Sequence, residues 1–526
     1  MLRMPKQLGV RVRMILAAVV ALLLFATTAS AEVLKGPYLQ NVTTESITVC
    51  VETDEPAMMT IAYGRDDISE QSVSFNAGAY AAQTTMRLPE PDDKSAAGFD
   101  PQETTRYIYK MRLENLKRGK SYVYRVTSGE FESAEKSFVT APHNLTPYTF
   151  VAFGDSRNGS PEAPNLVHEQ VTQRVHDVMP AFYLNTGDFV ASGEVYTDWD
   201  YHFYVENDLM GDAPMVPVFG NHEQGSDLKS GMSGDLLWAH YFDTGKDEDP
   251  TWFSFDYGNV HFIVIDVNKS VAISPLGAEY EWLKADIAAA KANPYTNFII
   301  GTFHQPVLGW KVDRTPDIRS KFFAWPVLRD GGVDLVLTGH DHFYARAEID
   351  GVPHVITAGG GAGLYDFIDD VEDQPGFKAA SKVHHYTVLD VSPKMIELTA
   401  YDAESNAVID SFTIEKDAAP EALPGDDDDD DDDTVDDDDD TADDDTVDDD
   451  TVDDDTVDDD TVDDDTVDDD VADDDTADDD ASDDDVMDDD ISDDDSTDDD
   501  DVGDDDVSDD DVDSDDDDDV GGGCGL

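Results

Sequence analysis

Residues 149–155 read Thr-Phe-Val-Ala-Phe-Gly-Asp, a mostly apolar run that ends in a glycine and then in a carboxylate. An apolar run followed by a side chain that can bind a metal recurs at residues 181–188, 215–221, 297–304 and 334–342. Such runs are typical of buried strands, and open α/β sheets place their functional sites at the C-terminal ends of their strands. The pattern therefore predicts an α/β domain with a site at its strand ends.

The polar residues at these ends are, in chain order, Asp155, Asp188, Asn221, His304, His340 and His342. Carboxylate and amide oxygens mixed with imidazole nitrogens suit Fe, Mn or Zn. One carboxylate can bridge two ions roughly 3.5–4 Å apart, and such a pair both neutralises a phosphate ester and activates a bound water near neutral pH. The sequence therefore predicts a phosphoesterase that uses two divalent or trivalent metal ions and a phosphorylated substrate.

Several stretches resemble the calcineurin-like metallophosphoesterase superfamily and, within it, the purple acid phosphatase-like branch. They are Phe-Gly-Asn-His-Glu at residues 219–223, the segment 252–262, Glu-Trp-Leu at 281–283 and Gly-His-Asp-His-Phe-Tyr at 339–344. The resemblance covers about residues 33–415. For residues 143–417 it implies a catalytic domain of two facing sheets flanked by helices, with the metals at the sheet edge.

The resemblance also implies a role for each metal-binding side chain. Asp188 would bridge the ions, Asp155 and His342 would hold the first ion, and Asn221, His304 and His340 would hold the second. His222 follows a ligand directly and is the candidate for protonating the leaving group or contacting the phosphate, because imidazole can donate a proton near neutral pH.

The sequence departs from the family pattern at two positions. Arg157 stands two residues after the first Asp, where the superfamily often has a His ligand. Ala191 stands three residues after the bridging Asp, where purple enzymes supply a Tyr. The first metal therefore lacks one expected protein ligand. Arg157 is a catalytic candidate because a guanidinium fork suits phosphate, and a structural ion pair is the alternative.

Residues 1–31 have the pattern of a signal peptide. Basic residues precede the apolar stretch 15–25, and Ala-Ser-Ala at 29–31 is a cleavage motif. We therefore expect a secreted or cell-surface protein, in a bacterial envelope. The alternative is an uncleaved anchor, although the apolar stretch is shorter than the roughly 20 residues needed to span a bilayer.

Residues 32–142 contain short β-type runs separated by turns, which predicts an all-β sandwich. Residues 35–40 and 122–126 resemble the fibronectin type III-like N-terminal domain of purple acid phosphatases. The segment has no cluster of metal ligands. We expect it to pack against the catalytic domain or to form the substrate rim.

Three histidines outside the ligand series need separate interpretations. His168 lies on a segment with valines at helical spacing, which predicts the polar side of a surface helix. His261 lies inside the strand-like run 260–264 and is interpreted as structural. His202 remains undecided between a surface position and a substrate contact.

Residues 418–526 form an acidic tail with Thr-Val-Asp-Asp-Asp repeats. From Asp426 onward there are 62 Asp and no Lys or Arg, against a formal net charge of −89 for the whole chain. A segment this charged cannot bury a core, so the tail is predicted to be disordered. A solvated spacer and weak Ca²⁺ binding are both open, while the charge disfavours nucleic acid.

The last residues resemble a bacterial surface-sorting signal. The chain ends in Gly-Gly-Gly-Cys-Gly-Leu, similar to the Gly-Cys start of such signals but without their apolar helix and basic cluster. This motif raises cell-surface attachment as a hypothesis. The sequence thus predicts an exported dinuclear phosphoesterase. The alternative is a non-catalytic surface protein that keeps the fold and binds partners or Ca²⁺.

Overall fold

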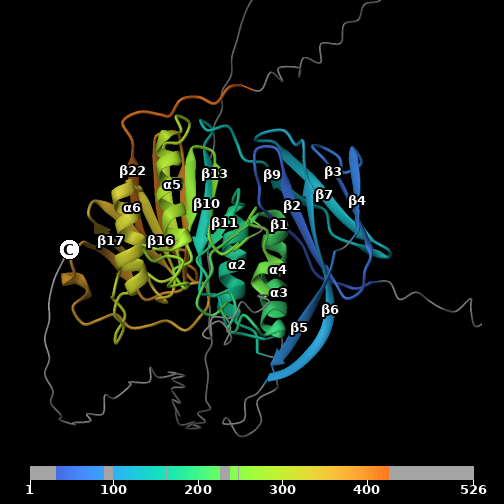
Figure 1. The fold of residues 1–526 in the computed structure, drawn as a ribbon, viewed down its shortest axis with the longest axis horizontal. Coiled ribbons are helices and arrows are strands. Elements are labelled where there is room, and N and C mark those ends of the chain that lie inside the picture. Colours follow the sequence, from blue (N-terminus) through green and yellow to red (C-terminus); the bar gives the residue numbers. More distant parts are fainter. Residues whose placement is uncertain are drawn as a thin grey trace, which may run out of the picture. The chain divides into compact units, whose positions relative to one another are not determined.

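The computed structural model describes residues 31–76, 78–87, 99–160, 163–224, 237–246 and 248–425 (Figure 1). The chain divides into two compact units, Met1–Asp433 and Thr434–Leu526, and every described residue belongs to the first. Residues 1–30 of the predicted signal peptide and the Asp-rich tail beyond Gly425 lie outside the described residues. None of the described helices is both long enough and apolar enough to cross a membrane.

The N-terminal part is a β-sandwich of two antiparallel sheets. One sheet has the order β1 (Val33–Gln40), β2 (Ile47–Thr53), β6 (Phe99–Leu113) and β5 (Gly78–Arg87). The other has the order β4 (Gln71–Asn76), β3 (Met58–Gly64), β7 (Ser121–Ser128) and β8 (Phe131–Glu132), with β9 (Lys136–Val139) beside β7.

The two sheets share one apolar core, to which strands of both sheets contribute buried side chains. Tyr122, Tyr124 and Val126 of β7 are buried in the same cluster as Val49 of β2 and Met111 of β6. The period of two places these side chains on one face of each sheet. The predicted all-β sandwich is confirmed, while its likeness to a fibronectin type III domain stays a prediction.

The following part is an α/β domain with two sheets. One sheet has the order β12 (Met215–Pro217), β11 (Tyr183–Asn185), β10 (Tyr148–Phe153), β20 (His385–Val391), β21 (Met395–Asp402) and β22 (Val408–Glu415). The other has the order β13 (Phe253–Tyr257), β14 (Val260–Val264), β15 (Phe298–Phe303), β16 (Leu335–Thr338), β18 (Val352–Thr357), β17 (Tyr344–Ile349) and β19 (Phe377–Ser381).

The two sheets face each other across an aromatic layer. Phe150 of β10 stacks on Phe182 at a centroid distance of 4.9 Å, and both rings meet Phe262 of β14 edge-on at 5.3 and 5.4 Å. Such pairs contribute about 0.5–1.5 kcal/mol each beyond the area they bury. All three rings are fully buried, so this layer joins the sheets into one core.

Helices cover the outer face of each sheet (Figure 1). On the first sheet lie α2 (Leu166–Val178), α3 (Tyr196–Asp212) and α4 (Leu237–Tyr241). On the second lie α5 (Ala278–Ala292), the π-helical turn η3 (Ser320–Ala324) and α6 (Trp325–Gly331). A short 3-10 turn, η4 (Val371–Asp373), precedes β19. The predicted arrangement of two facing sheets flanked by helices is confirmed.

The sandwich packs on the α/β domain through a buried lysine. Lys35 Nζ of β1 lies 2.7 Å from Glu52 and 2.5 Å from Asp200 of α3, and 3.9 Å from the ring centre of Tyr196. Tyr124 donates a hydrogen bond to the carbonyl of Gly211 at the end of α3. These contacts support the expected packing role of the sandwich and fix α3 between the two domains.

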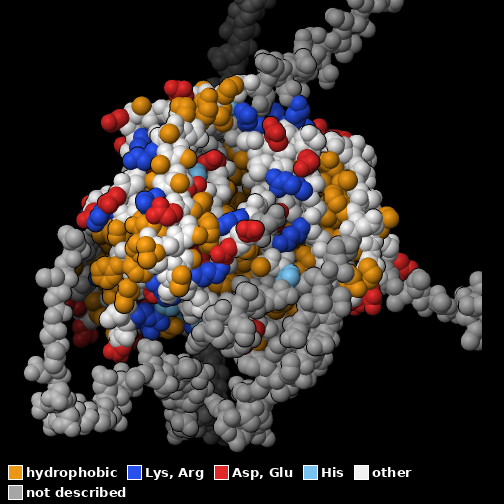
Figure 2. All heavy atoms as spheres, in the orientation of Figure 1, with side chains coloured by type: hydrophobic (Ala, Val, Ile, Leu, Met, Phe, Trp, Pro, Cys, Tyr) orange, Lys and Arg blue, Asp and Glu red, His pale blue; other side chains and the backbone are white. Residues whose placement is uncertain are grey.

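The segment after β22 remains attached to the folded domain. Asn144 Nδ2 donates to the carbonyl of Glu421 at 2.7 Å, and the Leu423 N–H donates to Asn144 Oδ1 at 3.0 Å. On the face shown in Figure 2, acidic and basic side chains are interspersed. That face therefore lacks the single-sign charge that the sequence gives the tail.

Candidate metal centre

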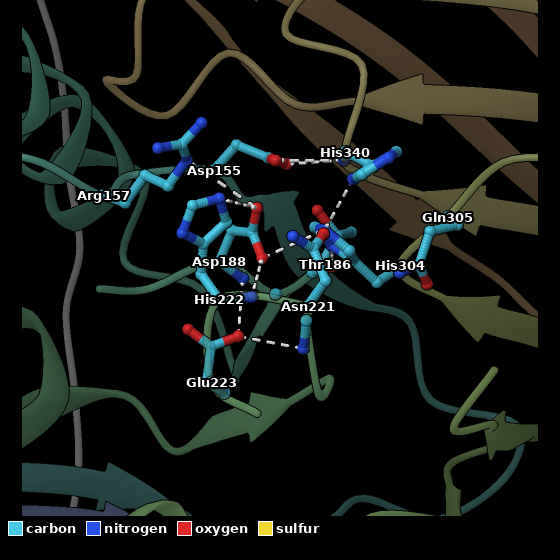
Figure 3. Close-up of polar contacts among 12 residues, drawn as sticks. Asp155, Arg157, Thr186, Asp188, Asn221, His222, Glu223, His304, Gln305 and His340 are labelled. Carbon is cyan, nitrogen blue, oxygen red and sulfur yellow. Dashed lines mark hydrogen bonds and ion pairs between the residues drawn. The ribbon is translucent and has the colours of Figure 1, made fainter. Parts of the chain in front are cut away.

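Six polar side chains converge where parallel strands of the two sheets end, and Figure 3 labels five of them, all except His342. The first sheet supplies Asp155 after β10, Asp188 after β11 and Asn221 after β12, and the second supplies His304 after β15 and His340 and His342 after β16. Strands β10, β11 and β12 run parallel, as do β15 and β16. Parallel strands bring their C-terminal ends to one edge, so these residues meet; we call them the strand-edge cluster.

Three residues of the strand-edge cluster have left-handed backbone conformations. The φ angles of Asp155, Asp188 and His340 are 58°, 56° and 70°. Asp, Asn and His tolerate this region better than most residues, and outliers of this kind concentrate at functional sites. The sharp turns aim each side chain from the strand end into the space between the sheets.

Neighbouring glycines allow the close approach of these side chains. A Cβ at Gly220 would lie 2.3 Å from Asp188 Oδ1, and one at Gly339 would lie 2.6 Å from Asp155 Oδ2. Both distances are shorter than real Cβ contacts, so any other residue would displace a carboxylate. The Gly-Asn-His and Gly-His-Asp-His motifs are thus needed sterically as well as chemically.

The candidate ligands form two overlapping groups that share Asp188. The ligand atoms of Asp155, Asp188 and His342 all lie within 4.8 Å of one another, and so do those of Asp188, His304 and His340. Asn221 Oδ1 lies 3.1 Å from His304 Nε2 and so belongs beside the second group. The structure brings all six predicted residues together.

His304 shows why this donor set suits a cation. Its Nε2 atom lies 3.1 Å from Asp188 Oδ1, 3.1 Å from Asn221 Oδ1 and 3.2 Å from His340 Nδ1. A single N–H cannot satisfy three acceptors at once, whereas a cation placed among four lone pairs can. The residues therefore fit a metal at this point.

The Nδ1 atoms of His304 and His342 are held by backbone carbonyls. His304 Nδ1 lies 2.9 Å from the Thr186 carbonyl, and His342 Nδ1 lies 2.6 Å from the Gly363 carbonyl. A donated Nδ1–H fixes the tautomer in which Nε2 carries the lone pair, as metal-binding histidines usually require. His342 Nε2 then faces Asp155 Oδ1 at 3.4 Å.

The electrostatic field of the cluster favours an ionised carboxylate at its centre. Burial would raise the pKa of Asp188, but His304, His222 and Arg157 hold it well below its usual range. Burial would lower the pKa of His304, but Asp188 raises it to about 9. Burial and the neighbouring His304 and Arg314 lower the pKa of His340 well below its usual range.

Glu223 supports the cluster without belonging to it. Its carboxylate accepts backbone N–H bonds from Asp188 and Gly220 at 2.9 Å and from Phe189 at 2.8 Å. Burial and the nearby Asp188 charge raise the pKa of Glu223 to about 8, while these N–H donors favour its charged form. It lies in the Phe-Gly-Asn-His-Glu motif, but the motif alone did not reveal its contacts.

Arg157 and His222 both face Asp188 (Figure 3). Arg157 Nε and His222 Nε2 each lie 3.8 Å from Asp188 Oδ2. Arg157 Nη2 donates to the Tyr365 hydroxyl at 3.3 Å, and its Nε has no hydrogen-bond partner among the described residues. His222 Nδ1 lies 2.7 Å from the Ala191 carbonyl, which leaves Nε2 directed at the cluster.

Tyr365 is a site residue that the sequence patterns did not reveal. Its ring stacks on His342 at a centroid distance of 4.0 Å, and Lys311 Nζ lies 4.1 Å above the ring. It follows a glycine-rich segment, residues 359–363, directly after β18. That glycine run at a strand end was the signal that could have located it.

The interpretation of His168 as a surface residue was wrong, and His202 also lies in the interior. Both imidazoles are buried, His168 on α2 and His202 on α3, each only 1% exposed. The valine spacing correctly predicted α2, but α3 covers the side of α2 that was expected to face solvent. His202 therefore contacts neighbouring side chains in the interior and not the substrate.

Residues 148–344 match the family model of calcineurin-like phosphoesterases. An uncharacterised protein of Mycobacterium tuberculosis is 26% identical over 340 residues, which are 55% of this chain and 61% of the relative. Purple acid phosphatase 15 of Arabidopsis thaliana is 24% identical over 311 residues, 52% of this chain and 57% of the relative. The chain thus spans about three-fifths of the length of these curated relatives.

A solved structure shows the same fold. The purple acid phosphatase from yellow lupin seeds superposes with a TM-score of 0.59 at 19% identity, covering 72% of this chain and 74% of the lupin chain. Together with the sheet topology and the strand-edge cluster, these matches define the class. Residues 148–344 thus carry a calcineurin-like phosphoesterase domain, and the chain is similar to purple acid phosphatases over about half of its length.

Proposed function

We propose that this chain is an exported phosphoesterase whose active site holds two metal ions. The observation that carries the proposal is the sharing of Asp188 between two groups of candidate ligands. A carboxylate with two oxygens can bridge two ions, which is the arrangement of dinuclear hydrolases. The family supports a phosphoester as the substrate.

Each ion has a set of residues that would hold it. Asp155, Asp188 and His342 would hold the first, and Asp188, Asn221, His304 and His340 the second. When bound, the pair supplies charge neutralisation for the phosphoryl group and a lowered pKa for the attacking water. Mixed oxygen and imidazole donors suit Fe, Mn or Zn.

Arg157 is proposed to bind the phosphoryl group. Its guanidinium lies over the cluster, held at one end by the Tyr365 hydroxyl at 3.3 Å. Its 3.8 Å approach to Asp188 is too long for a hydrogen bond, so donors remain for a phosphate oxygen. A planar fork on a tethered side chain orients an anion with little further loss of conformational entropy.

His222 is proposed to protonate the leaving group. With Nδ1–H donated to the Ala191 carbonyl, Nε2 is the ring atom that reaches the reaction space. Nε2 must carry a proton to act as the acid, so the active form is the imidazolium. Burial lowers the pKa of His222, while Asp188, 3.8 Å away, opposes this shift and favours the charged form.

Metal analysis followed by ester hydrolysis tests the proposal. The purified protein is stripped of metal and reloaded with Fe, Mn or Zn, and hydrolysis of an aryl phosphate monoester and an aryl phosphate diester is measured. We expect about two ions per chain at the strand edge and metal-dependent turnover of at least one ester. A folded, metal-loaded protein that hydrolyses neither ester would favour a non-catalytic binding protein.

We further propose that the Asp-rich tail is a solvated spacer on the exported enzyme, with weak Ca²⁺ binding at most. Truncation after Gly425 should leave turnover of a small ester unchanged at high salt. At low ionic strength the tail should repel anionic substrates, so the intact protein should be slower than the truncated one. At 0.1 M salt the Debye length shrinks to about 10 Å, and this difference should disappear. Loss of activity at high salt after truncation would contradict the spacer role.

A further inference from the structure

A second group of metal-binding side chains lies between helices α2 and α3. His168 comes from α2, and His202 and Glu206 lie one turn apart on α3. Their three potential ligand atoms lie within 4.8 Å of one another. None belongs to the strand-edge cluster, and we call this group the interhelical cluster.

The interhelical cluster is closed to solvent and close in geometry. His168 and His202 are 1% exposed and Glu206 is 0% exposed. Glu206 Oε1 lies 2.9 Å from His168 Nε2 and 3.6 Å from His202 Nδ1. Ligands about 2.0–2.1 Å from a tetrahedral Zn²⁺ are separated by roughly 3.3 Å, a value between the two observed distances.

His202 is the least satisfied member of the cluster. Neither of its ring nitrogens has a hydrogen-bond partner among the described residues. Phe189, Trp199 and Phe203 meet its ring edge-on at centroid distances of 5.4, 6.1 and 5.7 Å, so no polar group replaces the missing partner on those sides. A buried imidazole without partners is unfavourable, which calls for a ligand at Nδ1, the atom that faces Glu206.

Charge and tautomer support a cation at this point. Burial lowers the pKa of His202 to about 4 even though Glu206 opposes the shift, so the ring is neutral with a free lone pair. Burial would raise the pKa of Glu206, but its hydrogen bonds with His168 and Tyr183 lower it, so the carboxylate is charged. Its other oxygen accepts a 2.8 Å hydrogen bond from the Tyr183 hydroxyl, which orients it.

His354 shows that an unpartnered imidazole does not by itself indicate a metal. Both of its ring nitrogens also lack hydrogen-bond partners within the described part of the chain. Its ring packs edge-on against Trp325 at 4.4 Å, and burial alone lowers its pKa to about 3. The interhelical cluster differs because a second imidazole and an ionised carboxylate face the same point.

We infer that His168, His202 and Glu206 form a structural site for one divalent transition-metal ion of the Zn²⁺ class. Two imidazole nitrogens and a carboxylate oxygen are ligands that Zn²⁺ accepts. All three side chains are buried, which suits a structural ion and not a catalytic one. The ion would join α2 to α3. Helix α3 also contacts the sandwich, through Asp200 and the Gly211 carbonyl. By holding α3 in place, the ion would stabilise the interface between the two domains.

The full chain without an affinity tag provides the first test. Metal per chain is measured by elemental analysis in the wild type, His202→Leu and Glu206→Gln, with His354→Leu as the matched control. We expect a loss of about one Zn²⁺ per chain in the first two variants and none in the control. Ions held loosely by the tail cancel because every protein carries the same tail.

The same comparison in an Asp188→Asn background separates the two metal sites. The strand-edge ions should be depleted in this variant, and one ion should still be lost on adding His202→Leu. Unchanged metal content on adding His202→Leu overturns the inference. The dinuclear proposal stands or falls separately, on the ions lost with Asp188.

A measurement on the unaltered protein covers the case in which the variants do not fold. Anomalous diffraction at the zinc edge from wild-type crystals locates each bound ion. We expect a peak between His168 Nε2, His202 Nδ1 and Glu206 Oε1. Absence of a peak there in a crystal grown with Zn²⁺ overturns the inference, and the three residues are then a buried hydrogen-bonded group.

Discussion

The strand-edge cluster and the interhelical cluster use the same side-chain chemistry but are built differently. At the strand edge, each ligand follows a strand, and Asp155, Asp188 and His340 adopt left-handed turns. Between the helices, His202 and Glu206 have regular helical backbone and His168 faces them from α2. The first arrangement stores backbone strain and leaves Asn221 and His340 partly exposed, whereas the second relies on ordinary packing of fully buried side chains.

The backbone that carries the ligands affects whether a metal site is suited to a reaction or to a structural role. Ligands on loops at a sheet edge leave Arg157 and His222 beside Asp188 with partly exposed side chains. Ligands on two packed helices are surrounded by apolar and aromatic side chains. We therefore expect changes at the strand edge to alter turnover and changes between the helices to alter stability.

The largest effect is expected from Asp188→Asn. An amide cannot carry the charge that a bridging ligand shares between two cations, so metal content should fall and turnover should drop on the order of 10³-fold or more. Turnover and metal content of purified protein check this. The fold should persist, as judged by circular dichroism, because an Asn side chain keeps an oxygen that accepts the His222 N–H.

Asp334→Asn is the matched control for that change. Asp334 is a mostly buried carboxylate at the opposite end of β16, where it accepts the Ile299 N–H and pairs with Lys416. Its loss should affect stability and leave metal content and turnover near wild type. Near-normal turnover in a folded Asp188→Asn protein would contradict the dinuclear mechanism.

A smaller but clear effect is expected from Glu223→Gln. The carboxylate accepts N–H bonds from the turns that carry Asp188 and Gly220, and an amide would turn its own donors toward those N–H groups. Metal affinity, measured by competition with a chelator, should weaken about 10–100-fold. Unaltered affinity would show that Glu223 only stabilises the turns and has no influence on the ligands.

The strand-edge cluster could be predicted because its signals are local in the sequence. A buried strand, a glycine and a ligand lie within a few residues of each other, and parallel strands bring such units to one edge. Asp188, His304 and His340 could therefore be assigned to one site from the sequence alone. The β-sandwich followed from the short β-type runs of residues 32–142, whereas the two facing sheets were implied by the family resemblance.

The interhelical cluster could not be predicted because its signal depends on tertiary packing. His202 and Glu206 are four residues apart, a spacing that also occurs on exposed helix faces. Only the packing of α3 on α2 buries His168, and nothing local to α2 specifies that contact. Tyr365 was missed for a similar reason, because it reaches His342 from a loop more than twenty residues further along the chain.

Variants of Arg157 test whether its side chain binds substrate or forms a structural ion pair with Asp188. If it binds phosphate, Arg157→Ala should raise KM about 10–100-fold, corresponding to a charge-assisted hydrogen-bonded pair, and leave metal content near wild type. Arg157→Lys should recover only part of the loss, since it lacks the fork. Steady-state kinetics and metal analysis together check this. Loss of metal with unchanged KM would instead identify Arg157 as an ion-pair partner of Asp188.

The smallest effect concerns His261, an imidazole between two carboxylates that no metal is needed to explain. Its Nδ1 lies 2.8 Å from Asp256 and its Nε2 lies 2.9 Å from Asp286. Burial opposes protonation, but the two hydrogen-bonded carboxylates raise the pKa of His261 to about 9. The folded state thus binds a proton more tightly than the unfolded chain, whose His has a pKa near 6.5.

His261→Gln should therefore destabilise the protein in a pH-dependent way. The stabilising contribution is full below about pH 6.5 and is lost as the pH rises through about 9, so the deficit of the variant should shrink over that window. Because Asp256 is 60% exposed, solvent screening reduces the expected contribution to about 2 kcal/mol. Unfolding temperatures of wild type and variant across pH 6 to 10 check the sign. A deficit that stays constant across this range would mean that His261 acts through packing and not through its charge.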